Sequence, residues 1–283
     1  MFEQSYTFNK ILMINLKTLN KVAFLLSFAV LLNTFAGCKA DPQPAVNIEI
    51  EKEFSVSMTE NLSQTGNNFA FFVETVKPQK SGDTLLDCLL IKSDNKIKLL
   101  INGVQKGQGS SAALDAKAKA DLSAGSLPNG FYDISLNLLN STIENKGVLV
   151  VDESKYSINF STKDGFLLQN TELYKTPPNL IWGYVSYESS ADAAAAKVVL
   201  NQLELLSLGV YVPVGKYPFF NITVSNGAPE ILENSSFSTM NKETFIRRIS
   251  YDLSDLQTFV DGVKQNYPKL GIKIFASNGK KLQ

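Results

Sequence analysis

Hydrophobic and polar residues alternate in short runs between positions 47 and 176, and turn-forming residues separate the runs. In residues 131–139, Tyr132, Ile134, Leu136 and Leu138 are apolar and the positions between them are polar. Successive side chains of a strand point to opposite faces of its sheet, so this spacing buries one face and leaves the other in water. We therefore expect an antiparallel, Ig-like β-sandwich over residues 47–176.

Segments 145–147, 152–155 and 163–165 have the composition of turns. The alternating residues Tyr156, Ile158 and Phe160 lie between the last two of these segments and predict a further strand. Residues 106–125 are rich in Gly, Ser, Ala and Lys, which predicts a long surface loop or a short exposed helix.

The pattern changes after Pro177-Pro178, which marks a candidate domain boundary. The predicted elements beyond it are a strand at 180–187, a helix at 191–208, strands at 210–214 and 244–251, a helix at 254–267 and a strand at 271–276. The order β-α-β, β-α-β is that of a ferredoxin-like fold. We therefore expect a smaller α/β domain over residues 177–283, with an insertion at 215–242.

Residues 245–249, with the sequence FIRRI, resemble the third strand of the SPOR domain, a ferredoxin-like module found in lipoproteins. Residues 182–277 follow the order of its elements, although Ser186 and Ser250 stand where that family has glycine. The resemblance implies binding to peptidoglycan.

The first 37 residues have the composition of a signal peptide. Lys17 and Lys21 precede the apolar stretch 22–32, and the small residues Ala36 and Gly37 follow it. A charged segment, a short apolar segment and a small-residue site are arranged in the order that signal peptidases require.

The run Phe35-Ala36-Gly37-Cys38 resembles the lipobox of bacterial lipoproteins. The resemblance implies cleavage before Cys38, a diacylglycerol on its sulfur and an acyl chain on its freed amine. Several acyl chains anchor a protein stably, because each buried methylene contributes roughly 0.8 kcal/mol. Residues 38–46 would then form a tether. Lys39, by analogy with the family, favours the outer membrane of the cell envelope.

The composition excludes several kinds of site within this chain. Histidine is absent, which rules out Ser-His-Asp triads, Cys-His pairs and histidine metal ligands. With 27 basic and 27 acidic residues, no basic surface for nucleic acid is indicated. We predict no metal and no cofactor. Cys88 lies in an apolar run and is expected to be a buried structural thiol.

Four further features have patterns that could carry chemistry. Ser93–Lys96 and Ser277–Lys280 have the S-x-x-K spacing of serine acyl-enzymes but the composition of polar turns. Glu49, Glu51 and Glu53 could be paired carboxylates of a glycosidase or a solvated strand face. Trp182 and Tyr184 share one face of a predicted strand and could stack on a sugar ring or pack in the core.

The first functional hypothesis is an envelope lipoprotein, held on the membrane through Cys38, that serves as a non-enzymatic binding or assembly module at the envelope, where an envelope protein is one possible partner. Two alternatives stay open. One is a lipoprotein that binds peptidoglycan or another glycan, with Trp182 and Tyr184 as stacking residues. The other is a carbohydrate-acting enzyme that uses Asp or Glu side chains.

Overall fold

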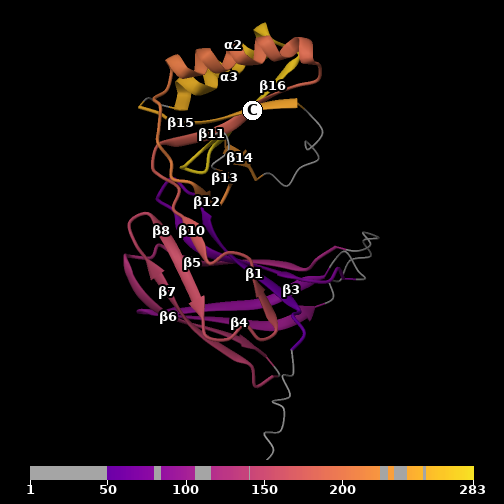
Figure 1. Ribbon diagram of the computed structural model, residues 1–283, viewed down its shortest axis with the longest axis vertical. Helices are drawn as coiled ribbons and strands as arrows, with labels where there is room; N and C mark the ends of the chain where they lie inside the picture. The colour runs from indigo at the N-terminus through magenta and orange to yellow at the C-terminus, as the bar shows by residue number, and fades with distance from the viewer. Residues whose placement is uncertain are drawn as a thin grey trace, which may run out of the picture. The chain divides into compact units, whose positions relative to one another are not determined.

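The computed structural model describes residues 50–79, 84–105, 116–139, 141–223, 229–232, 241–250 and 253–283. Residues 50–283 belong to one compact unit. Its described part consists mostly of strands in several sheets, with few helices (Figure 1). The fold is therefore α+β with a large excess of β structure.

Two sheets are built from residues 54–174 (Figure 1). The four-stranded sheet has the order β5-β2-β1-β9, and the six-stranded sheet has the order β10-β8-β7-β6-β4-β3. The strands are β1 (Phe54–Asn61), β2 (Asn68–Thr75), β3 (Leu85–Ser93), β4 (Lys96–Gln105), β5 (Lys119–Gly125), β6 (Gly130–Leu138), β7 (Glu144–Val151), β8 (Lys155–Phe160), β9 (Phe166–Leu168) and β10 (Glu172–Tyr174).

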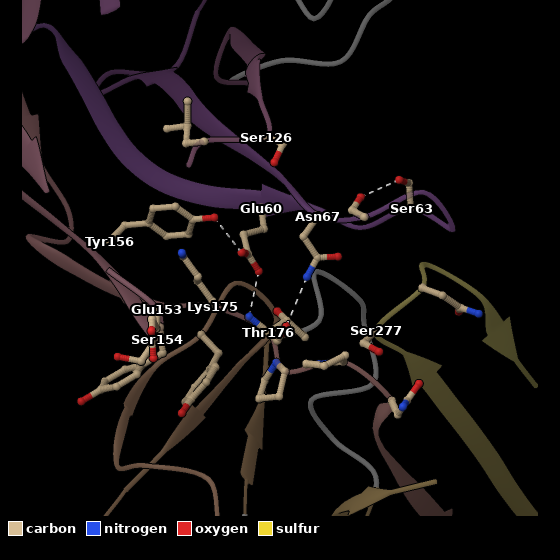
Figure 2. Close-up of a pocket in the computed structure, with 18 of the residues that line it drawn as sticks. Glu60, Ser63, Asn67, Ser126, Glu153, Ser154, Tyr156, Lys175, Thr176 and Ser277 are labelled. Atoms are coloured by element: carbon tan, nitrogen blue, oxygen red, sulfur yellow. Dashed lines mark hydrogen bonds between the residues drawn. The ribbon is translucent and has the colours of Figure 1, made fainter. Parts of the chain in front are cut away.

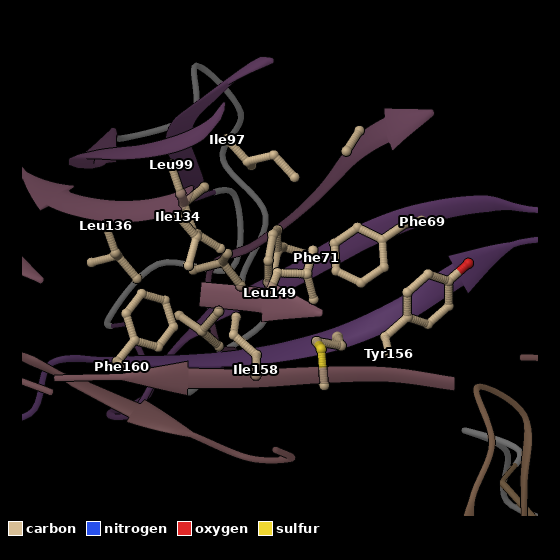
Figure 3. Packing of buried hydrophobic residues seen from close by; sticks show 14 of the residues in the cluster. Phe69, Phe71, Ile97, Leu99, Ile134, Leu136, Leu149, Tyr156, Ile158 and Phe160 are labelled. Atoms are coloured by element: carbon tan, nitrogen blue, oxygen red, sulfur yellow. The ribbon is translucent and has the colours of Figure 1, made fainter. Parts of the chain in front are cut away.

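One hydrophobic core takes residues from both sheets (Figure 3). The four-stranded sheet contributes Phe69 and Phe71, whose rings meet edge to face at 4.9 Å. The six-stranded sheet contributes the predicted alternating residues, among them Leu136, Ile158 and Phe160. The predicted strands at 131–139 and 156–160 are therefore confirmed, and burial of one face drives their pairing.

The strands are not all antiparallel, contrary to prediction. β4 runs parallel to β6, and β1 runs parallel to β9. The chain between β4 and β6 passes through β5, which pairs with β2 in the other sheet. This crossover returns the chain in its earlier direction, so β4 and β6 can pair only in parallel.

Two local predictions were wrong. Residues 119–125, expected in a loop or helix, form β5, while residues 106–115 of that segment lie outside the described ranges. Residues 145–147 lie inside β7 instead of a turn. The buried Asn145 amide bonds the loop at Thr162 and Asp164, and a Cβ on Gly147 would lie 2.3 Å from the Asn159 carbonyl oxygen. Asn145 is therefore present in β7 because its buried amide bonds the neighbouring loop, and Gly147 because β8 approaches too closely for a side chain.

A third sheet follows, with the order β15-β11-β16-β17. Its strands are β11 (Leu180–Tyr187), β15 (Asn241–Arg248), β16 (Leu270–Ala276) and β17 (Lys281–Leu282). The 3₁₀-helix η1 (Ser190–Asp192) leads into α2 (Ala193–Leu205), and α3 (Leu253–Asn266) follows β15. The predicted strands at 180–187, 244–251 and 271–276 and both helices are present, with shifted ends.

The two faces of this sheet are covered by different elements (Figure 1). Ile181 and Val185 of β11 pack on one side with α2 and α3. On the other side β11 packs against a small sheet of β12 (Gly215–Lys216), β13 (Phe220–Ile222) and β14 (Pro229–Ile231). Seven of the eight residues of β11 are consequently buried.

The predicted strand at 210–214 was wrong. After α2 only Leu208 pairs with the sheet, through two backbone hydrogen bonds with Arg248 of 2.7 and 2.9 Å. Tyr211 is then 88% exposed, and Pro213 has no backbone N–H to donate. The chain therefore leaves the sheet edge and continues into β12.

Candidate functional site

A cleft of about 640 Å³ lies where loops of the first two sheets meet the third sheet and its insertion (Figure 2). Its volume is in the range of small-ligand sites. The lining residues come from the end of β1 and the β1–β2 loop, from the loops before β6 and β8, from β8 and β10, from segment 175–179, and from positions 213, 217, 277 and 278.

Glu60 is the most unusual residue of the cleft because it is a carboxylate that is only 2% exposed. The Tyr156 hydroxyl donates to its Oε1 at 3.1 Å, and the Thr176 backbone N–H donates to its Oε2 at 2.9 Å (Figure 2). Burial raises the pKa of Glu60 above its ordinary value, and these hydrogen bonds, together with the charge of Lys175, oppose that rise. Both oxygens are thus engaged inside the protein.

Lys175 is also engaged inside the protein. Its Nζ donates to the Asp152 carbonyl oxygen and, at 3.2 Å, to the Asn129 Oδ1 atom. The same Nζ lies 5.2 Å from the centroid of the Tyr156 ring. The ammonium is therefore held by neutral acceptors and a ring face.

Two contacts hold the segments on either side of the cleft. The Asn67 Nδ2 atom donates to the Thr176 carbonyl oxygen at 3.2 Å (Figure 2). A Cβ on Gly279, whose φ is +82°, would lie 2.8 Å from the Leu62 carbonyl oxygen. The β16–β17 turn thus packs closely on the β1–β2 loop, and a side chain at Gly279 would force them apart.

Tyr174 supplies aromatic surface to the cleft. It is half-buried and stacks on the buried Tyr217 with ring centroids 5.3 Å apart. The Tyr217 hydroxyl donates to the Pro213 carbonyl oxygen at 3.0 Å, and burial raises the pKa of that hydroxyl. A Cβ on Gly215 would lie 2.4 Å from the Tyr174 ring, so the glycine permits this packing.

Several polar side chains of the lining make no hydrogen bond to any other described residue. They include the amides of Gln64 and Asn179, the hydroxyls of Ser126 and Ser277, and the carboxylate of Glu153. Asn179 adopts φ +58°, a conformation that asparagine tolerates better than most residues. These amides and hydroxyls can donate and accept hydrogen bonds without breaking contacts within the described structure.

The predicted stacking residues Trp182 and Tyr184 are 1% and 5% exposed. The Trp182 indole stacks against Phe219 at 5.7 Å and Phe275 at 6.0 Å between centroids. Its Nε1 has no acceptor among the described residues. These contacts are those expected if both residues pack in the core, and neither residue lines the cleft.

The other described residues considered from the sequence lie on different elements. Cys38 and Glu49 lie outside the described residues. Glu51, which precedes β1, forms an ion pair with Lys77. Burial, with the neighbouring Asp87 charge, raises the pKa of the half-buried Cys88 to about 12. Segments 93–96 and 277–280 are both turns between strands, as predicted.

Sequence reasoning missed Glu60. Phe54, Val56 and Met58 point inward at alternate positions of β1, and Glu60 continues the series. A carboxylate at a position whose spacing requires burial is the signal that could have identified it.

No family model matches the chain, and no curated protein or solved structure is significantly similar to it. Within the described ranges, no helix has the length and apolar character needed to cross a membrane. The same part of the chain contains no cluster of three or more Cys, Asp or Glu side chains suited to a metal ion.

Proposed function

We propose that this chain is a bacterial envelope lipoprotein, acylated at Cys38 and held at the outer membrane, whose folded part is a non-enzymatic binding module. Residues 1–37 would be the signal peptide and residues 38–46 the tether. The lipobox-like run at residues 35–38 supports the anchor, and the cleft beside Glu60 supports binding.

The observation that carries the binding proposal is the internal use of the Glu60 carboxylate. A carboxylate-dependent glycosidase needs one carboxyl as acid and a second as base or nucleophile, both free to reach the substrate. Glu60 uses both oxygens for Tyr156 and Thr176 in this structure. Binding therefore accounts for the cleft better than catalysis does.

We propose the finer fold assignment on the arrangement of strands. An Ig-like sandwich over residues 47–176 is supported by the core that the first two sheets share. A ferredoxin-like domain over residues 177–283 is supported by β11, which lies between β15 and β16 and is antiparallel to both. Its second strand would be reduced to the Leu208–Arg248 bridge. The SPOR-like interpretation of residues 182–277 stays a prediction.

The anchor is tested by metabolic labelling of cells with an alkyne analogue of palmitate, followed by membrane fractionation. Wild type should carry label and sediment with membranes, whereas Cys38→Ala should lose the label and leave the membrane fraction. Cys88→Ala is the matched control, because Cys38 and Cys88 are the two cysteines of the chain. Equal labelling of wild type and Cys38→Ala would refute the anchor.

A further inference from the structure

The polar surface of the cleft is mostly uncharged. Among the described residues, Lys175 is the only basic one that lines it, and its Nζ is already held by the Asp152 carbonyl oxygen and Asn129. Pro177, Pro178 and Pro213 offer no backbone N–H groups to a ligand anion. A phosphate, sulfate or carboxylate would therefore find no free positive charge in this lining.

The lining instead offers groups that match hydroxyls. Gln64, Asn179 and Ser277 come from different loops, and each side chain is without a hydrogen bond to other described residues. An amide and a hydroxyl both donate and accept, as a sugar hydroxyl also does. Several such groups around one cleft suit a ligand that carries many neutral hydroxyls.

The aromatic surface completes the match. Tyr174 is half-buried in the lining, and its stacking on Tyr217 at 5.3 Å holds its ring in one orientation. A fixed ring can pack against the apolar C–H face of a pyranose while its neighbours bond the hydroxyls. The Glu60 contact with Thr176 fixes the segment that follows Tyr174.

We infer that the cleft binds a neutral oligosaccharide, with Tyr174 as the stacking residue and Gln64, Asn179 and Ser277 as hydrogen-bonding residues. This inference rests on the proposed binding function and names its ligand class. It places the sugar site in this cleft and not at Trp182 and Tyr184, whose rings are occupied by protein packing.

The test uses full-length protein purified in a detergent without a sugar headgroup, since a maltoside or glucoside would compete. The neutral probes are the tetramers of N-acetylglucosamine, β-1,4-glucose, α-1,4-glucose and β-1,4-mannose, and the charged comparator is tetragalacturonate. Binding is measured by isothermal titration calorimetry up to millimolar concentration. At least one neutral probe should bind saturably, and tetragalacturonate should bind more weakly.

Cleft variants then locate the site. Tyr174→Ala should weaken binding by about two- to tenfold through loss of stacking. Ser277→Ala and Asn179→Gly should each weaken it by about two- to tenfold through loss of one hydrogen bond. These two keep the proposal testable if Tyr174→Ala fails to fold. The Ser277 hydroxyl makes no hydrogen bond to another described residue, and glycine tolerates the φ of +58° at position 179. Tyr211→Ala and Ser135→Ala are matched controls outside the cleft and should bind as wild type.

Three results would overturn the inference. They are the absence of binding by every neutral probe, binding that all cleft variants retain, and stronger cleft-dependent binding of tetragalacturonate. None of them affects the Cys38 labelling experiment, so a lipoprotein that carries label but binds no neutral sugar would refute the ligand class alone. Loss of the Cys38 anchor with intact sugar binding would refute only the membrane proposal.

Discussion

The buried Glu60 carboxylate should make the stability of this protein depend on Tyr156 and on pH in a defined way. Tyr156→Phe removes the hydroxyl that donates to Glu60 at 3.1 Å and changes little else in volume. A hydrogen bond contributes about 1 kcal/mol when both partners are neutral and about 1.5–3 kcal/mol when one is charged, so we expect a loss of about 1–3 kcal/mol. Urea denaturation followed by far-UV circular dichroism measures the free energy of unfolding.

Glu60→Ala tests the same contact from the other side. It leaves the Thr176 N–H and the Tyr156 hydroxyl buried without their acceptor, and each such group costs about 1–3 kcal/mol. In that background Tyr156→Phe should cost little or should stabilise, because it removes an unsatisfied hydroxyl. An equal cost of Tyr156→Phe in wild type and in Glu60→Ala would refute the coupling.

The pH dependence follows from the direction of the Glu60 pKa shift. Burial raises the pKa of Glu60 in the folded protein above its ordinary 4.5, so the folded state holds this proton over a higher pH range than the unfolded state. The resulting stabilisation is complete below the unfolded pKa and is lost as pH rises through the folded pKa. Wild type should gain stability relative to Glu60→Gln as pH falls from 7 toward 4. A constant gap would refute the raised pKa, and the exposed Glu188→Gln is the control.

Three further predictions use the same fold. Gly183→Ala should destabilise by about 3 kcal/mol or more in urea denaturation because its Cβ would lie 2.0 Å from the Lys273 carbonyl oxygen. Gly262→Ala lies in α3, where an added Cβ would meet no atom within 4 Å outside its own helix backbone, so it should stabilise the protein by about 0.5–1 kcal/mol. A Gly262→Ala variant less stable than Gly183→Ala would contradict the β11–β16 packing. In Cys38→Ala protein at pH 8, iodoacetamide should alkylate Cys88 more than about tenfold slower in the folded than in the urea-unfolded state, because the pKa of the folded thiol is raised to about 12. Mass spectrometry measures both rates, and equal rates would show an accessible thiolate. Trp182 is the single tryptophan, and its fluorescence should stay unchanged when an oligosaccharide binds the cleft, whereas a shift would favour stacking on Trp182 itself.

The spacing of apolar residues predicted the strands and helices that bury one face and expose the other. Tyr132, Ile134 and Leu136 alternate because one face of β6 meets the core, and α3 buries Leu256, Val260 and Val263 at helical spacing. The strand at 210–214 failed because an apolar run with Pro213 has no sheet edge to complete along its length. Whether such a run forms a strand depends on the segments that lie beside it in the folded protein.

The sequence by itself determined the absence of histidine chemistry and most strands and helices, because these depend on composition and on neighbouring residues alone. The anchor at Cys38 rests on the sequence alone and stays a prediction. Tertiary structure decided the rest. The insertion β12–β14 covers Trp182, and the meeting of segments more than a hundred positions apart brings Glu60 to Thr176. Burial and pairing between distant segments follow from three-dimensional packing, which residue periodicity does not encode.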